Sequence, residues 1–403
     1  MQLFIHILMV ALVATCQPTK ETPQAMTTQP ASTPTVSTIV TGAERLAVYF
    51  PQIEDKNIAL VVNQTSIVGQ KHLVDTLLKL GAHVKVVFAP EHGFRGKADA
   101  GELISDTKDA KTGLPIVSLY GKKKKPSNED MNGIDAVVFD IQDVGVRFYT
   151  YISTLHYIME ACAENKVPLI VLDRPNPNAY FIDGPMLRPE FKSFVGMHPV
   201  PVVYGMTIGE YAKMINGEGW LPNQAKCTLT VIPCKNYNHQ SFYELLVKPS
   251  PNLPDMRSIL LYPSTCFFEG TTLSLGRGTD KPFQYIGHPK LSSDFSFTPM
   301  PNEGAKEPPL KGQVCYGSDL SKTTIGGIIK GGQINLSYLL HYYAEMKKIN
   351  EKFFLDNHFI DKLAGSDQLR LQIEKGMTET QIRATWQDDL DHFKKVRAKY
   401  LLY

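Results

Sequence analysis

Short apolar runs alternate with amphipathic segments from about residue 57 onward. The runs are rich in valine, leucine and isoleucine and alternate little with polar residues, which is typical of strands buried on both faces of a parallel sheet. They span residues 58–62, 84–88, 116–119, 136–139 and 169–172. Between them, residues 73–80 and 154–162 carry apolar side chains at helical spacing, and Gly81 stands where a helix-ending glycine is expected. This pattern predicts a doubly wound, Rossmann-like α/β domain.

The strand and helix alternation extends beyond residue 172 and then changes character. Residues 200–203 and the helix-like segment 207–215 continue it, and residues 227–232 are the predicted final strand. After about residue 236 the chain has proline-rich connections, a glycine-rich loop and two helix-like stretches at 336–346 and 378–399. We therefore expect a Rossmann-like domain over residues 43–240 and a smaller C-terminal α/β domain over residues 241–403.

The N-terminal segment has the composition of an export signal. Residues 4–14 are almost entirely apolar and are followed by Cys16, which predicts a lipoprotein-type signal over residues 1–16. Residues 17–42 are rich in Thr, Pro and Ser and are predicted to form a tether. The chain is then an exported protein, periplasmic or associated with the outer membrane, and attached to the membrane through Cys16. An ordinary cleaved signal peptide is the alternative.

Composition and missing motifs exclude several classes of function. Lys and Arg number 42 against 40 Asp and Glu, so no basic footprint for nucleic acid is indicated. The first strand is followed by Asn63-Gln64-Thr65-Ser66 and not by GxGxxG, which argues against a nicotinamide or flavin enzyme. The chain also lacks a GxSxG motif and metal-like Cys or His spacing, so we expect neither a cofactor nor a metal. Single buried thiols are expected, with a Cys227–Cys234 bridge as the alternative.

Charged residues follow two predicted strands directly. Glu91 comes after the strand at 84–88, and Asp140 and Asp143 come after the strand at 136–139. Because the carboxyl ends of parallel strands meet at one edge of the sheet, these acids are predicted to lie close together. Two carboxyl groups are the minimum requirement for glycoside hydrolysis. The alternatives are that Glu91 pairs with Arg95 and Asp143 with Arg147, and that the tyrosines which follow begin a core helix.

Two further loops have a similar composition. Residues 173–177 follow another strand and are stiffened by two prolines, and residues 269–280 set charged side chains among glycines. Candidate substrate-binding residues in these loops and strand ends are Asn63, His92, Arg95, Gln142, Arg147, Tyr149, Tyr151, Arg174, Asn176, Glu269, Arg277 and Asp280.

The segments 91–96, 139–151, 172–177 and 269–286 resemble the exo-β-N-acetylmuramidases, a family long described as a domain of unknown function. The resemblance extends from about residue 43 to the C-terminus. It implies a Rossmann-like domain joined to a smaller α/β domain, with the active site in the cleft between them. It also implies release of N-acetylmuramic acid from the non-reducing ends of peptidoglycan fragments during cell-wall turnover, with Glu91 as the catalytic residue.

The resemblance agrees with the residues of the loops. N-acetylmuramic acid carries a lactyl carboxylate that an arginine can hold through two hydrogen bonds, and Arg147, Arg174 and Arg277 are the candidates. In the resulting hypothesis Glu91 protonates the glycosidic oxygen, and Asp140 or Asp143 activates water or stabilises the transition state. Two other functions fit the residues: a lipoprotein that binds muropeptides without cleaving them, and a metal-dependent hydrolase that uses His92 with the acids.

Overall fold

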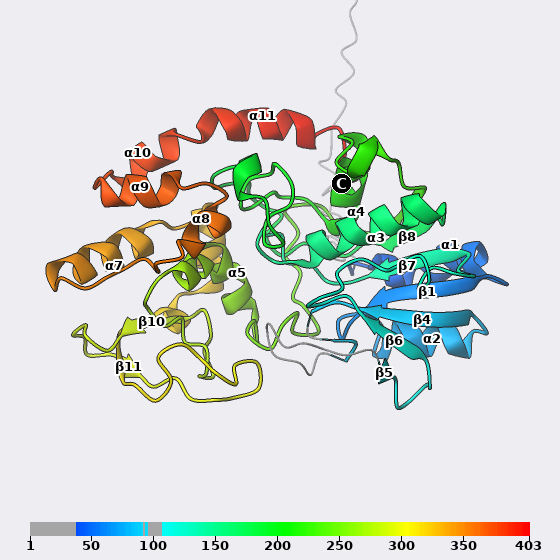
Figure 1. Cartoon of the computed structure of the whole chain (residues 1–403), viewed down its shortest axis with the longest axis horizontal. Coiled ribbons are helices and arrows are strands. Elements are labelled where there is room, and N and C mark those ends of the chain that lie inside the picture. Colours follow the sequence, from blue (N-terminus) through cyan, green and yellow to red (C-terminus); the bar gives the residue numbers. More distant parts are fainter. Residues whose placement is uncertain (1–37, 92, 96–106) are drawn as a thin grey trace, which may run out of the picture. The chain divides into compact units, whose positions relative to one another are not determined.

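The computed structural model describes residues 38–91, 93–95 and 107–403, and Thr38–Tyr403 form one compact unit (Figure 1). Its largest element is a seven-stranded sheet in the order β5-β6-β4-β1-β7-β8-β9. All neighbouring strands are parallel except β5, which runs antiparallel to β6. The strands are β1 (Asn57–Val62), β4 (His83–Ala89), β5 (Thr107–Lys108), β6 (Pro115–Ser118), β7 (Ala136–Asp140), β8 (Leu169–Leu172) and β9 (Leu229–Ile232). The order reverses direction between β1 and β7, so the predicted doubly wound fold is confirmed.

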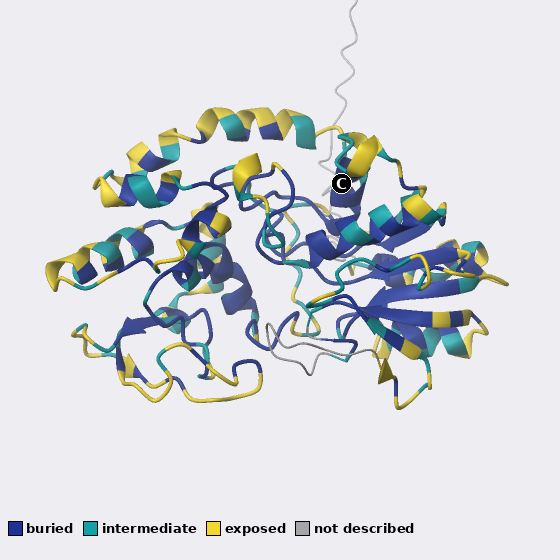
Figure 2. Cartoon of the chain, in the orientation of Figure 1, coloured by how far each residue is buried: buried dark blue, intermediate teal, exposed yellow. Residues whose placement is uncertain are grey.

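Alternating residues of each central strand belong to different cores. Ala59 and Val61 of β1 pack in the cluster that contains α3 (Tyr151–Asn165) and α4 (Ile208–Gly217). Leu60 and Val62 pack in the cluster that contains α1 (Leu46–Ile53) and α2 (Leu73–Lys79). Figure 2 shows the central strands buried along their length. This burial on both faces explains why the strands appear in the sequence as continuous apolar runs.

Residues 200–203 do not form the predicted strand, so this prediction is wrong. Val203 forms only isolated bridges, to Val146 and to Asp183, and no strand includes it. Pro199 and Pro201 flank Val200, and proline has no N–H to donate to a strand ladder. The run is apolar because Val200, Val202 and Val203 are buried, not because it belongs to the sheet.

The C-terminal part combines a small antiparallel sheet with helices, as Figure 1 shows. The sheet has the order β10-β12-β11, formed by β10 (Tyr285–His288), β11 (Ser296–Phe297) and β12 (Cys315–Asp319). The predicted helix at 378–399 is two helices, α10 and α11, interrupted at Thr385 and Trp386. The helices are α5 (Met256–Thr265), α6 (Ile325–Gly331), α7 (Ser337–Lys348), α8 (Phe359–Ala364), α9 (Gln368–Glu374), α10 (Glu379–Ala384) and α11 (Gln387–Arg397). The predicted domain boundary near residue 240 stays a prediction.

Smaller elements complete the described chain. A two-stranded hairpin pairs β2 (Ile67–Val68) with β3 (Lys71–His72). The 3-10 helices are η1 (Gly42–Glu44), η2 (Pro189–Phe191), η3 (Pro222–Gln224), η4 (Cys266–Gly270) and η5 (Leu320–Lys322). Within the described ranges no helix is both long and apolar enough to cross a membrane. The cysteines described, from Cys162 to Cys315, are free and buried, which confirms the expected single thiols and leaves Cys227 and Cys234 unbridged.

The loop after β7 connects the sheet to the C-terminal elements through Arg147. Its side chain is 0% exposed, and its guanidinium donates to the carbonyl oxygens of Pro185 at 2.9 Å, Val200 at 2.7 Å and Leu363 at 2.9 Å. Leu363 belongs to α8, so one side chain joins segments more than 200 residues apart. Gly365 has a φ of +79°, and a Cβ there would lie 2.7 Å from the Arg147 guanidinium. The close approach therefore requires glycine at position 365.

Replacing Arg147 by methionine keeps most of the side-chain volume but removes the donor to the buried carbonyls of Pro185 and Leu363, while the Val200 carbonyl keeps the Leu187 amide as a donor at 3.2 Å. Each carbonyl left without a donor costs about 1–3 kcal/mol, so we expect the free energy of unfolding to fall by at least about 2 kcal/mol. Urea unfolding followed by circular dichroism measures this change. Arg188→Met is the matched control, because Arg188 is half exposed and makes a surface ion pair with Asp389 worth at most about 1 kcal/mol. Equal unfolding midpoints for the two variants would contradict the role of Arg147.

Candidate active site

A cavity of about 150 Å³ lies at the carboxyl edge of the parallel sheet. Three strands of the sheet lead into it: Glu91 follows β4, Tyr120 follows β6, and the segment 148–150 follows β7, with β1 between β4 and β7. The C-terminal part completes the walls. The lining residues are Glu91, Tyr120, Phe148, Tyr149, Thr150, Phe194, Val195, Ser250, Asn252, Leu253, Tyr262, Glu269, Arg277 and Phe283. The structure thus brings Glu91, Tyr149, Glu269 and Arg277 together, as the loops predicted.

Two hydroxyl groups hold the Glu91 carboxyl. Thr150 Oγ1 donates to Glu91 Oε2 at 3.0 Å, and the Tyr120 hydroxyl also hydrogen-bonds Glu91. Burial raises the pKa of Tyr120, and the negative charge of Glu91 raises it further, so the phenol stays protonated. Because a hydroxyl can both donate and accept, these two groups can hold Glu91 with or without its proton.

Arg95 has a different partner from the one considered in the sequence. Its guanidinium donates to Asp109 through Nε at 3.0 Å and through a terminal nitrogen at 2.8 Å. This hydrogen-bonded pair lowers the pKa of Asp109 to about 2. Arg95 does not line the Glu91 cavity. It therefore joins the described segment 93–95 to Asp109.

Glu269 and Arg277 form an ion pair in the wall of the cavity. Arg277 Nε donates to Glu269 Oε1 at 3.1 Å, and one terminal nitrogen contacts the same oxygen. The other terminal nitrogen has no hydrogen-bond partner in the part of the chain that the structure describes. The same two residues line a second, mainly apolar cavity of about 360 Å³. The ion pair thus separates two cavities, while Asp280 is exposed and lines neither.

Two tyrosines after β7 support the site differently. Tyr149 lines the cavity, and its hydroxyl donates to the carbonyl of Pro249 at 2.8 Å. Tyr151 is the first residue of α3, which confirms that one of the two tyrosines begins a core helix. Its hydroxyl accepts from Asn63 Nδ2 at 2.9 Å, so Asn63 is a buried support and does not reach the cavity.

The acids that follow β7 do not line the Glu91 cavity. Asp140 is fully buried and accepts from Arg174 at 2.6 and 2.8 Å. Asp143 is also buried, accepts from the Tyr204 hydroxyl and from the Gly145 amide at 2.7 Å, and has its pKa raised to about 6 by burial. This geometry corrects the expectation that Asp140 or Asp143 shares a cavity with Glu91; the acid that does so is Glu269.

Four other predicted binding residues also lie away from the cavity. Arg174 is held by Asp140, and Arg147 by three backbone carbonyls. Gln142 Nε2 donates to the carbonyls of Asp143 and Pro175, and Asn176 Nδ2 donates to that of Met206. These buried groups hold the strand-end loops in place and do not line the Glu91 cavity, so their predicted contact with substrate stays a prediction. His92 and Cys16 lie outside the described residues.

The sequence pattern did not predict some of the residues that line the Glu91 cavity, among them Tyr120 and Asn252. Tyr120 follows β6 as Glu91 follows β4, so the rule that selected Glu91 would also have selected Tyr120. Asn252 lies in a proline-rich connection without any periodic signal. In the described ranges no group of three His, Cys, Asp or Glu side chains is arranged to hold a metal ion.

Comparison with known proteins agrees with this geometry. Residues 58–257 match the family model of the exo-β-N-acetylmuramidase NamZ N-terminal domain, and residues 260–403 match that of the C-terminal domain. The peptidoglycan β-N-acetylmuramidase NamZ of Bacillus subtilis (strain 168) is 39% identical over 386 residues, covering 88% of this chain and 89% of that protein.

Two solved structures of DUF1343 family proteins from Bacteroides fragilis NCTC 9343 have the same fold. One superposes with a TM-score of 0.84 at 47% identity, and covers 91% of this chain and 99% of its own. The other has a TM-score of 0.75 at 29% identity, with the same coverage of both chains. Both family models together span most of the sequence. The chain therefore belongs to the exo-β-N-acetylmuramidase NamZ family.

Proposed function

We propose that this chain is an exo-acting glycoside hydrolase that releases N-acetylmuramic acid from the non-reducing end of peptidoglycan fragments. The observation that carries the proposal is that one cavity contains two carboxyl groups and an arginine, supplied by Glu91, Glu269 and Arg277. Membership of the NamZ family supports the reaction class and the substrate. Muramyl saccharides derived from peptidoglycan are then its ligands, and cell-wall turnover is its role.

Glu91 is the general acid in this proposal. It donates its proton to the glycosidic oxygen as the bond to the anomeric carbon breaks, which lets the rest of the fragment leave as an alcohol. The hydroxyls of Thr150 and Tyr120 keep the carboxyl oriented before and after the proton is transferred.

Glu269 is the second carboxyl group. Its carboxylate is held in the cavity wall by Arg277 and can stabilise the oxocarbenium-like transition state or activate the attacking water. Asp140 and Asp143 lack this position, because their carboxylates are buried against Arg174 and Tyr204.

Arg277 is the ligand for the lactyl carboxylate. Its Nε and one terminal nitrogen are engaged by Glu269, which leaves a terminal nitrogen with two N–H donors for the substrate. A charge-assisted hydrogen bond of this kind distinguishes muramic acid from glucosamine, which lacks the lactyl group.

Removing either carboxyl group should abolish most of the activity. Glu91→Gln and Glu269→Gln are each expected to lower kcat for a chromogenic N-acetylmuramide by at least about 100-fold, the usual contribution of an acid or base group. Absorbance of the released chromophore measures the rate. Glu190→Gln, a change at an exposed glutamate, is the control and should leave the rate unchanged. Near-normal activity of Glu91→Gln would refute the assignment of the acid, and near-normal activity of Glu269→Gln that of its partner.

Replacing Arg277 should change substrate preference. Arg277→Met is expected to lower kcat/KM for the muramide about 10- to 100-fold further than for the matching N-acetylglucosaminide, since only the muramide loses a charge-assisted contact. The measurement is the ratio of the two kcat/KM values in variant and parent. An equal loss on both substrates would instead mean that Arg277 acts only by holding Glu269.

We also infer that the protein is exported as a lipoprotein. Support comes from the apolar stretch at 4–14, the cysteine at position 16 and the Thr/Pro/Ser-rich segment that follows. In cells grown with a radiolabelled fatty acid, the full-length chain should incorporate label and fractionate with membranes, and Cys16→Ser should do neither. Unlabelled wild-type protein would contradict lipidation and favour a cleaved signal peptide.

A further inference from the structure

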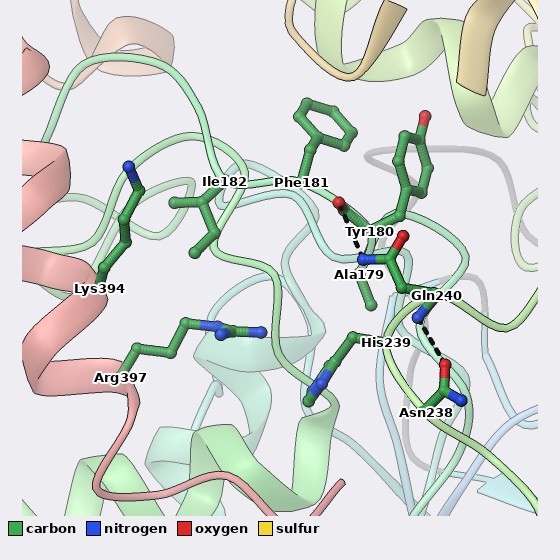
Figure 3. Close-up of a pocket in the computed structure, with 9 residues that line it drawn as sticks. All are labelled: Ala179, Tyr180, Phe181, Ile182, Asn238, His239, Gln240, Lys394 and Arg397. Atoms are coloured by element: carbon green, nitrogen blue, oxygen red, sulfur yellow. Dashed lines mark hydrogen bonds between the residues drawn. The ribbon is translucent and has the colours of Figure 1, made fainter. Parts of the chain in front are cut away.

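A second cavity, of about 550 Å³, lies beside the last helix and shares no lining residue with the Glu91 cavity. Figure 3 shows its walls, which come from three segments: residues 179–182 after β8, residues 238–240, and α11. The volume falls within the range of about 300–1,000 Å³ that is usual for small-molecule sites. The proposed hydrolase reaction uses none of these residues.

The wall formed by α11 is cationic. Lys394 and Arg397 are three residues apart and therefore project from the same side of the helix. Arg397 Nε donates to the carbonyl of Gly205 at 2.8 Å, and in the described part of the chain the guanidinium has no carboxylate partner. Lys394 is paired with Asp391 at 2.9 Å, but both side chains are about half exposed, so this pair is weak.

The opposite wall adds an imidazole. Figure 3 shows His239 and Arg397 directed toward each other from the two sides of the cavity. His239 Nε2 lies 2.9 Å from Glu210 Oε2, and the two Glu210 oxygens also accept from the amides of Thr207 and Leu402. The charge of Glu210 acts on Arg397, but the Glu210 oxygens are occupied by His239 and two backbone amides, so Arg397 makes no ion pair with it and can still face an anionic ligand together with Lys394.

Aromatic and amide groups form the rest of the cavity. Tyr180 and Phe181 are partly exposed, with ring centroids 4.8 Å apart and planes at 43°, and Ile182 follows them. Tyr180 and Phe181 also line a neighbouring cavity of about 350 Å³, and the apolar surface of this wall can pack against the C–H face of a pyranose ring. Gln240 lines the same cavity and has an amide that can bind hydroxyl or acetamido groups. The cavity therefore combines cations for a carboxylate with a surface for a sugar ring.

We propose that this cavity is a second binding site for carboxylate-bearing amino sugars, separate from the hydrolytic site. The choice of N-acetylmuramic acid as its ligand rests on the proposed function, whereas the preference for an acid over a neutral sugar rests on Lys394 and Arg397. Such a site would keep the enzyme on muramyl saccharides while the Glu91 cavity turns them over.

Titration calorimetry with N-acetylmuramic acid on the intact protein tests this proposal. Two sites per chain are expected in the parent. Lys394→Glu combined with Tyr180→Ala should weaken one of them at least ten-fold, since a carboxylate would meet like charge. Lys395→Glu is the matched control, because Lys395 neighbours Lys394 on the same helix without lining the cavity. The double variant should hydrolyse a chromogenic muramide at the parental rate.

The possible outcomes separate the two proposals. One site per chain, unaffected by the double variant, would overturn the second site even if the protein is an active muramidase. Two sites without any hydrolysis would overturn the proposed function and leave the second site standing. N-acetylglucosamine should bind the second site at least ten-fold more weakly than N-acetylmuramic acid, and equal binding would refute the role of the cations.

Discussion

The buried guanidinium of Arg147 is the interaction on which the active-site geometry depends. It and the next two residues form one continuous connection from the end of β7 to the C-terminal elements. Arg147 donates to the carbonyl of Leu363 in α8, and Tyr149 donates to the carbonyl of Pro249. Between them, the Phe148 ring packs edge-on against Tyr262 and Phe267, with ring centroids 5.2 and 5.7 Å apart. Because Glu269 and Arg277 belong to these C-terminal elements, the same connection positions them in the cavity of Glu91.

Many polar side chains at the strand ends are structural supports and do not line the Glu91 cavity. At the reversal point between β1 and β7, Asp140 is neutralised by Arg174, and Asn63 supports Tyr151. Buried charges and amides need partners of this kind, since an unpaired one would destabilise the fold. The polar residues at the ends of β1 and β7 therefore hold the loops in place, whereas Glu91 and Tyr120, which follow the next two strands β4 and β6, line the cavity.

Much of the sheet could be predicted from the sequence, because strands buried on both faces appear as apolar runs wherever they occur. The run at 200–203 has the same apolar pattern but is buried outside the sheet. The apolar pattern alone cannot distinguish these two kinds of burial. Strand-end position predicted a place for Glu91 at the carboxyl edge of the sheet, where it lines the cavity. It failed for Asp140 and Asp143, because position gives no side-chain direction and does not reveal that Arg174 and Tyr204 occupy their oxygens. Glu269 and Glu91 are nearly 180 residues apart in the sequence and share the cavity only through tertiary contacts, which the sequence pattern does not reveal.

The proposed function requires that the cavity with Glu91, Glu269 and Arg277 both hydrolyses muramides and recognises the lactyl carboxylate. The most direct measurement uses the unmodified protein with a chromogenic N-acetylmuramide and the matching N-acetylglucosaminide. We expect release of N-acetylmuramic acid with a kcat/KM at least about ten-fold above that for the glucosaminide, corresponding to one charge-assisted contact. Equal turnover of the two substrates, or binding of the muramide without cleavage, would contradict it.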